Sequence, residues 1–316
     1  MATKPFASSA DRGVKEQTLE VLADGVYALT AEGDPNLGAI EGDDFLVCFE
    51  ALATPVAARR WLAKLREHTD KPVRYLVLSH YHAVRVLGAS AFDAEIIVSS
   101  AQTKALIAER GQQDWESEYG RMPRLFEEPE SIPGLTWPTV TFRDTLTIEL
   151  GGDRGELELR FHGRGHTEGD IVAWLPRQRI VFAGDLVESQ AALYTGDAFH
   201  FDWAAGTLDS VKALGAEQLI GGRGAIARGR DAVDAAIEQT RDFLLTMQRT
   251  VGDAQTLTEA FAATHAALAP KYGTWPIFEH CLPFDVQRLW DEIHGIERPV
   301  IWTADRDRQV WDELQS

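Results

Sequence analysis

The sequence has few cysteines and no long apolar run, and each absence excludes a class of protein. Cys48 and Cys281 are the only cysteines in 316 residues, which is too few for a disulfide framework. No stretch of about 18 apolar residues is present, so no membrane span is predicted. The N-terminal residues are polar and lack the apolar core of a secretion signal. A reducing cytoplasm is therefore the expected location.

Basic residues are also scarce relative to acidic ones. The chain has 31 Lys and Arg against 49 Asp and Glu, a formal net charge of −18. This balance disfavours nucleic acids and anionic membrane surfaces, because both bind basic faces. We therefore expect a small-molecule substrate, and the sequence leaves open a homo-oligomer. The hydrophobic content of 45% and the charged content of 25% are ordinary for a soluble globular protein.

Strand and helix patterns alternate in the first part of the chain. After an expected loose tail (1–18), apolar strand patterns cover 25–33 and 37–51. Residues 54–70 place apolar side chains at helical spacing, with Thr54 as the expected N-cap. Further strands are expected at 71–80, ending at a pair of histidines, and at 94–100. This alternation is typical of an α/β fold.

The remaining chain divides into three parts. Residues 101–135 have a helical pattern that becomes proline-rich, and we interpret this stretch as an insertion. Four strand patterns follow in quick succession between 140 and 185, which predicts a meander. From about 225 the pattern is helical. We expect a main domain over 19–230 and a helical extension over 231–316 packed on it.

Four polar features lie at the ends of these strands or in the loops just after them. His80 and His82 are two residues apart, so in an extended segment they point to the same side and can share one metal ion. His166 lies in a glycine-rich turn. Asp185 closes an apolar strand, where a buried carboxylate is costly unless a cation meets it. Arg223 lies between glycines after another apolar stretch.

The order and spacing of these residues resemble the metallo-β-lactamase superfamily. The motifs read His-Tyr-His-Ala-Val-Arg at 80–85, His-Thr-Glu-Gly-Asp at 166–170, Gly-Asp at 184–185 and Gly-Gly-Arg-Gly at 221–224. The superfamily patterns are His-x-His-x-Asp-His, His-Thr-x-Gly, Gly-Asp and Pro-Gly-His-Gly. The resemblance implies an α/β fold of four layers, an αββα sandwich, here followed by the C-terminal helical extension.

The resemblance also implies a metal site of which this chain keeps one half. The ligands of a first metal match His80, His82 and His166, and Asp185 matches the acid that bridges two metals. The ligands unique to a second metal are replaced by Val84, Arg85 and Arg223. Valine has no ligand atom, and arginine keeps its proton at any working pH. We therefore expect one divalent metal: zinc first, with iron and manganese as alternatives.

The leading hypothesis is a metal-dependent hydrolase that activates water against an ester, lactone, thioester or amide bond. Asp185 would orient that water or act as its base. Arg85 and Arg223 would bind a substrate oxyanion or acidic group, or would only form ion pairs, with Asp185 and Glu50 as partners, that fill the vacant position. Tyr81 and His280 are further candidate substrate contacts, and Asp170 is a candidate acceptor that orients a ligand histidine.

Two other functions fit the same residues. Two histidines and a carboxylate can hold non-haem iron, and the resemblance extends to persulfide dioxygenases, which share this sandwich and use one iron. The other alternative is a non-catalytic metal-binding protein. That alternative predicts that His80→Ala leaves the function intact.

Overall fold

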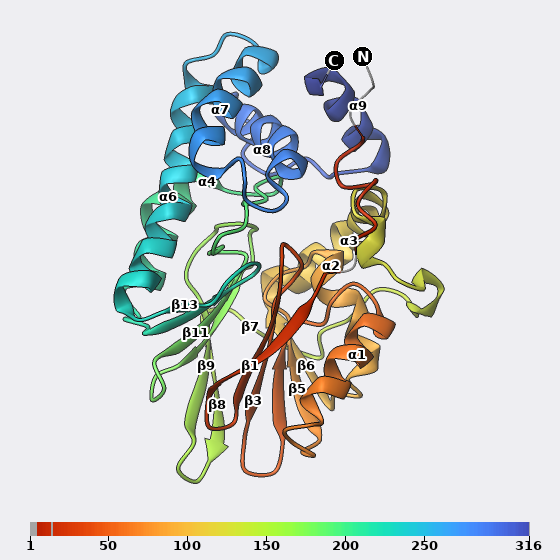
Figure 1. Ribbon diagram of the computed structural model, residues 1–316, viewed down its shortest axis with the longest axis vertical. Helices are drawn as coiled ribbons and strands as arrows, with labels where there is room; N and C mark the ends of the chain where they lie inside the picture. Colours follow the sequence, from red (N-terminus) through yellow and green to blue (C-terminus); the bar gives the residue numbers. More distant parts are fainter. Residues whose placement is uncertain (1–4, 14, 316) are drawn as a thin grey trace.

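The computed structural model describes residues 5–13 and 15–315, and two β-sheets packed face to face form its centre (Figure 1). The first sheet has the strand order β1 (Gln17–Ala23), β2 (Val26–Ala31), β3 (Leu37–Glu41), β4 (Leu46–Phe49), β5 (Val73–Val77), β6 (Ile96–Ser100), β7 (Val140–Phe142). The second has the order β13 (Ala227–Arg228), β12 (Gln218–Gly221), β11 (Ile180–Gly184), β10 (Ile171–Leu175), β9 (Gly155–Phe161), β8 (Thr145–Gly151). Helices cover the outer faces, which confirms the αββα sandwich.

Strand β10 shows how the sequence builds these layers. Successive side chains of a strand point to opposite faces. Ile171, Ala173 and Leu175 enter the core between the two sheets. Val172 and Trp174 enter the core between the second sheet and the helices outside it. All five residues are apolar and buried, as expected for a strand that is covered on both faces.

The helix predicted after the fourth strand is confirmed as α1 (Pro55–Leu65). Its N-cap is Thr54, whose Oγ1 accepts a hydrogen bond of 3.2 Å from the Ala57 amide, and Pro55 is the first helical residue. Trp61 and Leu65 are fully buried against the first sheet. Burial of this apolar face holds the helix on the sandwich.

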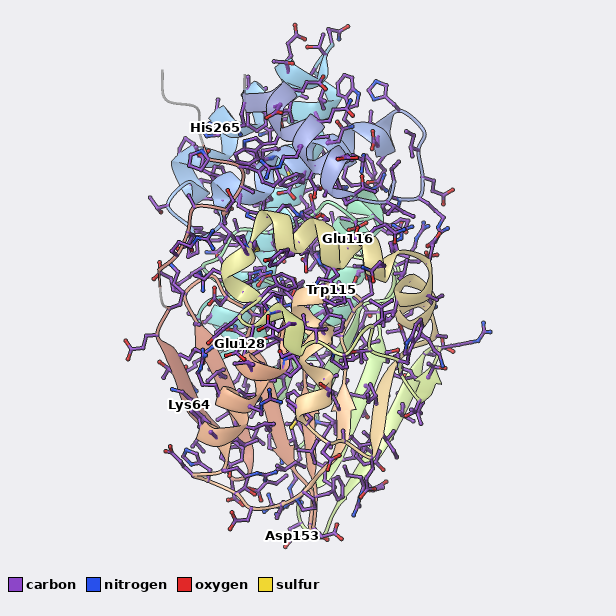
Figure 2. The ribbon with its side chains drawn as sticks, turned by 90° about the vertical axis from the view of Figure 1, so that its right-hand side faces the viewer. Lys64, Trp115, Glu116, Glu128, Asp153 and His265 are labelled. Carbon is purple, nitrogen blue, oxygen red and sulfur yellow. The ribbon has the colours of Figure 1, made fainter. Side chains whose placement is uncertain are left out.

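The predicted insertion begins with one long helix, α3 (Ala101–Arg121), which crosses the molecule between the sandwich and the C-terminal helices (Figure 2). Short 3₁₀ turns follow at Pro123–Leu125 and Pro129–Ser131. Three short helices lie in loops: α2 (Ala83–Val86), α4 (His200–Asp202) and α5 (Leu208–Lys212). Helix α3 thereby places polar side chains beside the loop that holds the histidine pair.

The C-terminal helical region is confirmed and contains α6 (Arg230–Gly252), α7 (Leu257–Tyr272), α8 (Phe278–Ile293) and α9 (Ala304–Gln315). Helix α6 contacts strands β12 and β13, so it joins the extension to the sandwich. The extension lies at one end of the long axis: Figure 2 labels His265 on α7 there and Asp153 in the β8–β9 turn at the other end. No described helix is both long and apolar enough to cross a bilayer.

Two local expectations about strands were wrong. Strand β5 ends at Val77, so His80 and His82 lie in the loop beyond it and not in an extended strand. Strand β7 is not part of the meander, because it pairs in parallel with β6 in the first sheet.

The described part of the N-terminal tail is also less loose than predicted. The Phe6 ring packs edge-on against Trp311 of α9 with ring centroids 5.6 Å apart. The Ser8 amide donates a 3.1 Å hydrogen bond to the Arg121 carbonyl at the end of α3. These contacts hold the segment against two helices. Residues 1–4 and 14 of the expected tail lie outside the described residues.

Candidate metal centre

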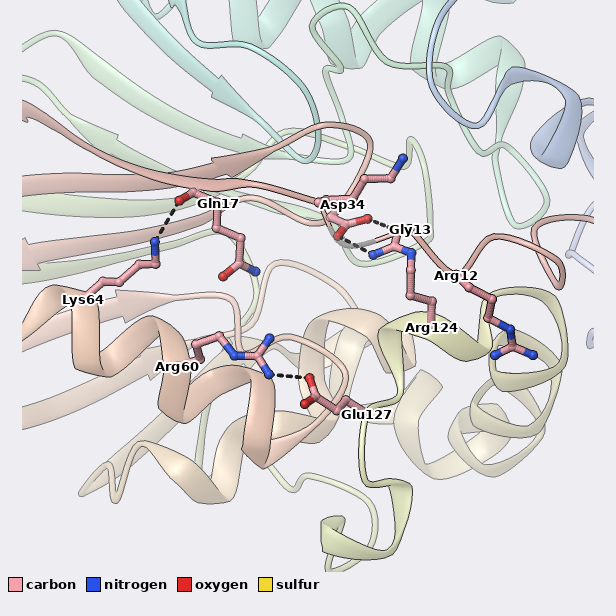
Figure 3. A pocket seen from close by; sticks show the side chains of 9 residues that line it. Arg12, Gly13, Gln17, Asp34, Arg60, Lys64, Arg124 and Glu127 are labelled. Atoms are coloured by element: carbon pink, nitrogen blue, oxygen red, sulfur yellow. Dashed lines mark hydrogen bonds and ion pairs between the residues drawn. The ribbon is translucent and has the colours of Figure 1, made fainter.

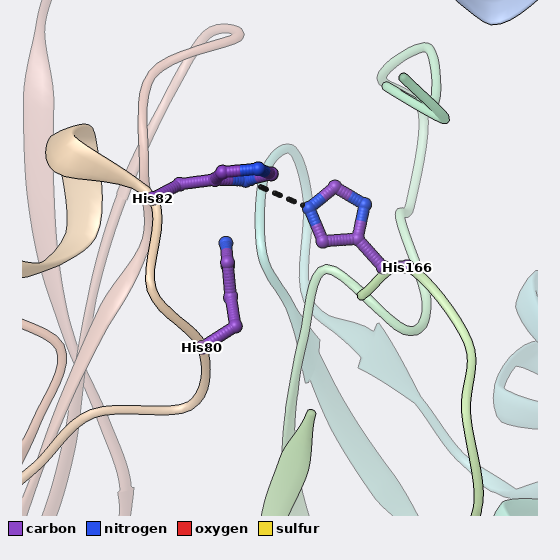
Figure 4. Close-up of side chains that lie close together, drawn as sticks. All are labelled: His80, His82 and His166. Carbon is purple, nitrogen blue, oxygen red and sulfur yellow. Dashed lines mark hydrogen bonds between the residues drawn. The ribbon is translucent and has the colours of Figure 1, made fainter. Parts of the chain in front are cut away.

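Three histidines from two loops meet at one point (Figure 4). His80 and His82 come from the loop between β5 and α2, and His166 from the loop between β9 and β10. One ring nitrogen from each lies within 4.8 Å of the others. The side chains are almost fully buried, with relative exposures of 0%, 2% and 1%. The structure therefore brings the three expected ligands of the first metal together.

Each ring has one nitrogen held by a neighbouring group and one turned inward. Nδ1 of His80 is 2.8 Å from Ser79 Oγ, and Nδ1 of His166 is 2.8 Å from the Tyr194 carbonyl oxygen. Nε2 of His82 is 3.1 Å from Asp197 Oδ2. The inward atoms are therefore Nε2 of His80, Nδ1 of His82 and Nε2 of His166. Partners on the outer nitrogen fix ring orientation and tautomer, as at metal sites in general.

The inward atoms fit a metal ion. The buried Nε2 of His80 has no hydrogen-bond partner among the described residues. Nδ1 of His82 is 3.0 Å from Nε2 of His166, and Asp185 Oδ2 is 3.9 Å from His80 Nε2 and 3.7 Å from His166 Nε2. A tetrahedral ion with bonds of about 2.0–2.1 Å needs ligand atoms about 3.3 Å apart. The distances bracket that value, so a small adjustment of side chains would accommodate the ion.

The electrostatics of the cluster favour a cation. Burial lowers the pKa of His166 to about 3 and holds the pKa of His80 well below its ordinary value, so both rings are neutral. Burial also opposes a charge on His82, but Asp114 and Asp197 outweigh it and raise the pKa of His82 to about 9. Without a metal the cluster therefore attracts a proton, which metal binding would displace.

Acidic residues that the sequence analysis missed hold the histidine loop in place. On α3, Asp114 Oδ2 accepts a 2.6 Å hydrogen bond from the Ala83 amide, and Glu118 Oε2 accepts a 2.8 Å hydrogen bond from the Val84 amide. Both amides lie in the first turn of the short helix α2, where backbone amides have no acceptor within the helix, and α2 has no side-chain cap of its own. Asp197 was also missed, because an isolated acid in a loop has no spacing that marks it.

Asp185 lies beside the histidines, directly after β11. Its position depends on Gly184, whose φ of +54° is left-handed and whose added Cβ would be 2.8 Å from Ser79 Oγ. Burial alone would raise the pKa of Asp185, but the positive charge of Arg85 outweighs it and holds that pKa well below the ordinary range. Asp185 is thus a stable anion beside the cluster.

The position expected for a second metal is filled by protein side chains. Val84 and Arg85 are 1% and 0% exposed. Arg85 forms an ion pair with Asp185 Oδ1, and its Nη1 donates a 2.8 Å hydrogen bond to the Gly222 carbonyl. A Cβ on residue 222 would collide with Asp185, so glycine is required there. The Asp185 ion pair expected for Arg85 forms, whereas Glu50 accepts a 2.9 Å hydrogen bond from the Ser79 amide.

Arg223 is engaged elsewhere than on Asp185. Its amide donates to Glu188, its Nε is 4.0 Å from Glu188 Oε1, and its Nη1 donates a 3.2 Å hydrogen bond to the Gly33 carbonyl. Arg223 is 4% exposed. These contacts, with those of Arg85, favour the interpretation in which both guanidinium groups fill space and balance buried acids.

Three further candidates have contacts that the sequence did not predict. Tyr81 is buried and packs on His82 with ring centroids 4.6 Å apart. Asp170 accepts hydrogen bonds from the amide and hydroxyl of Thr167, at 2.6 and 3.0 Å, so it shapes the His166 turn, whereas the Tyr194 carbonyl holds the His166 ring. His280 binds Ser8 Oγ at 2.8 Å, a contact with the N-terminal segment and not with the histidine cluster.

This chain belongs to the metallo-β-lactamase superfamily. The model of that superfamily matches residues 31–223, more than half of the chain and the part that carries all the residues of the centre. A metallo-β-lactamase from Pontibacter korlensis has a similar fold, with a TM-score of 0.57 at 20% identity. That comparison covers 73% of this chain and 99% of the other.

Curated relatives share only part of their length with this chain. A linear primary-alkylsulfatase from Pseudomonas sp. (strain ATCC 19151) is 22% identical over 241 residues, 64% of this chain and 44% of the relative. The 2,4-dinitroanisole O-demethylase subunit alpha from Nocardioides sp. (strain JS1661) is 26% identical over 205 residues, 63% of this chain and 54% of the relative. The chain thus spans about half the length of these relatives.

Proposed function

We propose that this protein is a metal-dependent hydrolase with one metal ion, most favourably zinc, held by His80, His82 and His166. The observation that carries the proposal is the arrangement of the three imidazole rings. In each ring one nitrogen contacts a neighbouring group, and the other nitrogen is turned toward a common point. A zinc ion with three protein ligands supplies Lewis-acid activation of water for attack on an ester, lactone, thioester or amide bond.

Asp185 is proposed to orient the water and not to act as a strong base. Its Oδ1 is engaged by Arg85, while its Oδ2 lies near the inward nitrogens of His80 and His166. The positive charge of Arg85 keeps the pKa of this carboxyl low despite burial, which weakens it as a proton acceptor. A hydrogen-bond acceptor held at a fixed place is the role that this geometry supports.

A single metal is favoured because the second position already holds positive charge. The guanidinium of Arg85 contacts Asp185, the carboxylate that would otherwise bridge two metals. A second divalent ion would have to share that carboxylate with a fully buried cation. The residues thus support a mononuclear centre, and the substrate contact once expected from Arg85 would require its ion pair to open.

The test compares turnover with and without metal. The purified protein would be stripped with a chelator and assayed against esters, lactones, thioesters and amides before and after zinc is restored. We expect hydrolysis of one class to disappear with the metal and return with zinc, and Asp185→Asn to lower kcat more than it changes KM. Oxygen consumption with a thiol-type substrate and bound iron would instead favour the dioxygenase, and hydrolysis unchanged in His80→Ala would contradict the proposal.

A further inference from the structure

A groove with basic walls lies on the surface formed by α1, the N-terminal segment and the turn after α3 (Figure 3). Its outer part has a volume of about 260 Å³. Within an acidic chain of net charge −18, five of the nine residues that line it are cationic. They are Arg12, Lys15, Arg60, Lys64 and Arg124.

Neighbouring acids do not balance these cations. Arg124 binds Asp34 through both Nη atoms, at 2.9 and 2.5 Å, and Arg60 contacts Glu127 at 2.5 Å. Asp11, just outside the lining, is 3.4 Å from Arg124 Nε and 3.9 Å from Lys15 Nζ. Three carboxylates against five cations leave two positive charges. The Lys64 ammonium donates to a neutral group, the Gln17 carbonyl, at 2.9 Å.

The groove continues inward over an apolar floor. A second cavity of about 60 Å³ shares five lining residues with the outer one, including Arg60 and Arg124. Its other walls are apolar side chains, namely Pro35, Leu52, Ala53, Ala57, Val84 and Leu125. Val84 lies in α2, two residues after His82, so the inner end of the groove reaches the helix that directly follows the histidine loop.

We propose that this groove binds an organic anion that joins one acidic group to an apolar body. The acidic group would lie in the outer part, where Lys64 and the nearby arginines leave excess positive charge. The apolar body would lie over Leu52, Ala57 and Val84. This site is distinct from the three histidines and does not require metal or catalysis, so it can be tested separately from the hydrolase proposal.

The probe is octanoate, titrated into the full chain by isothermal titration calorimetry below its micelle concentration. We expect one binding site per chain, weaker binding at higher salt, and much weaker binding of acetate and of octylammonium. Acetate has the charge without the apolar body, and octylammonium has the apolar body with the opposite charge. Octyl sulfate tests whether the acidic group must be a carboxylate.

Two pairs of variants locate the site on α1. Lys64→Gln removes a cation of the groove, and Arg59→Gln removes an exposed cation of the same helix that does not line it. Ala57→Glu places an anion on the inner floor, and Ala63→Glu places one on an exposed position of that helix. We expect Lys64→Gln to weaken octanoate binding about threefold to tenfold and Ala57→Glu by about tenfold or more, with little change in the two controls.

Several results would overturn this proposal. One is no octanoate binding at millimolar concentration, and another is binding of acetate or octylammonium as strong as that of octanoate. A third is octanoate binding that neither Lys64→Gln nor Ala57→Glu changes while both variants keep the wild-type melting temperature. If Lys64→Gln unfolds the chain, Arg12→Gln provides the same comparison from an exposed residue on the other side of the groove.

Discussion

The two metal positions expected for this sandwich differ in whether ligand atoms remain available for an ion. At the first, His80, His82 and His166 direct one nitrogen each toward a common point. At the second, Arg85 is fully buried and paired with Asp185. At the first position the ring nitrogens are placed so that they could bind an ion, whereas at the second position Arg85 supplies a fixed positive charge.

The second position shows how a metal position can be lost while the residues around it remain ordered. Replacing a ligand by a neutral residue would leave Asp185 as a buried anion without a partner, which is strongly unfavourable. Arg85 supplies the missing positive charge permanently and adds a hydrogen bond to the Gly222 carbonyl. We therefore expect Arg85 to matter mainly for stability and the three histidines for the proposed metal-dependent activity.

The largest expected effect is at the first position. His166→Ala removes one of three ligands and should reduce bound metal from one equivalent toward none, with loss of any hydrolysis. His265→Ala is the matched control, because His265 is a partly exposed histidine on α7 that pairs with Glu279. Elemental analysis of both variants after dialysis measures the difference. Full metal content in His166→Ala would show that this ring is not a ligand.

At the second position the expected effect is on folding. Arg85→Met leaves Asp185 buried and unpaired, so we expect the free energy of unfolding to fall by about 3–5 kcal/mol. Arg228→Met removes an exposed ion pair with Glu20 and should change it by less than about 1 kcal/mol. Chemical denaturation measures both. Adding Asp185→Asn to Arg85→Met should recover part of the loss, and a loss that is purely additive would argue against the ion pair.

A smaller effect is expected from the residue that holds the His82 ring. Asp197→Asn keeps the shape of the side chain but weakens its interaction with Nε2 of His82, at 3.1 Å in the native chain. Loss of such a partner lowers metal affinity by about 10- to 100-fold. Competition with a chromogenic chelator measures the affinity. Asp202→Asn is the control, since Asp202 pairs with Arg164 on the surface, and equal affinities in both variants would contradict the assigned role.

The smallest effect concerns a histidine outside the centre. Burial lowers the pKa of His162 to about 4 from its ordinary value near 6.5, and its Nδ1 contacts Ser210 Oγ at 2.6 Å. The unfolded chain therefore binds a proton more readily, and stability is lost as the pH falls from about 6.5 to about 4. His162→Gln should flatten the melting temperature over that interval while metal content stays unchanged. If the melting temperature of His162→Gln depended on pH as it does in the wild-type chain, the lowered pKa of His162 would be contradicted.

Much of the fold follows from local patterns that the sequence displays. Thr54 and Pro55 mark the start of α1, and the order of the four motifs indicates the sandwich. Helix α9 lies within the predicted helical extension, but it is mostly polar and buries only a few apolar side chains, among them Trp311, so its pattern does not mark its bounds. Strand β7 was assigned to the wrong sheet, because a three-residue strand has no pattern that names its neighbour.

The sequence predicted the residues of the centre that lie in motifs, because metal binding requires certain residue types at fixed spacing. His80, His82, His166 and Asp185 each stand in a motif. Asp114, Glu118 and Asp197 act through contacts made only after α3 and the loop after β11 reach the histidine loop, so their sequence neighbourhood does not mark them. His280 was a candidate substrate contact because apolar residues flank it, but its Nδ1 contacts Ser8 Oγ of the N-terminal segment.

The most direct test of a one-metal centre is the metal content of the full chain. The protein would be expressed with zinc, iron and manganese supplied, dialysed and measured by elemental analysis against protein concentration. We predict one equivalent of a divalent metal per chain, lost in His166→Ala and retained in Arg223→Met. Two equivalents in the wild-type chain, or none, would contradict the account.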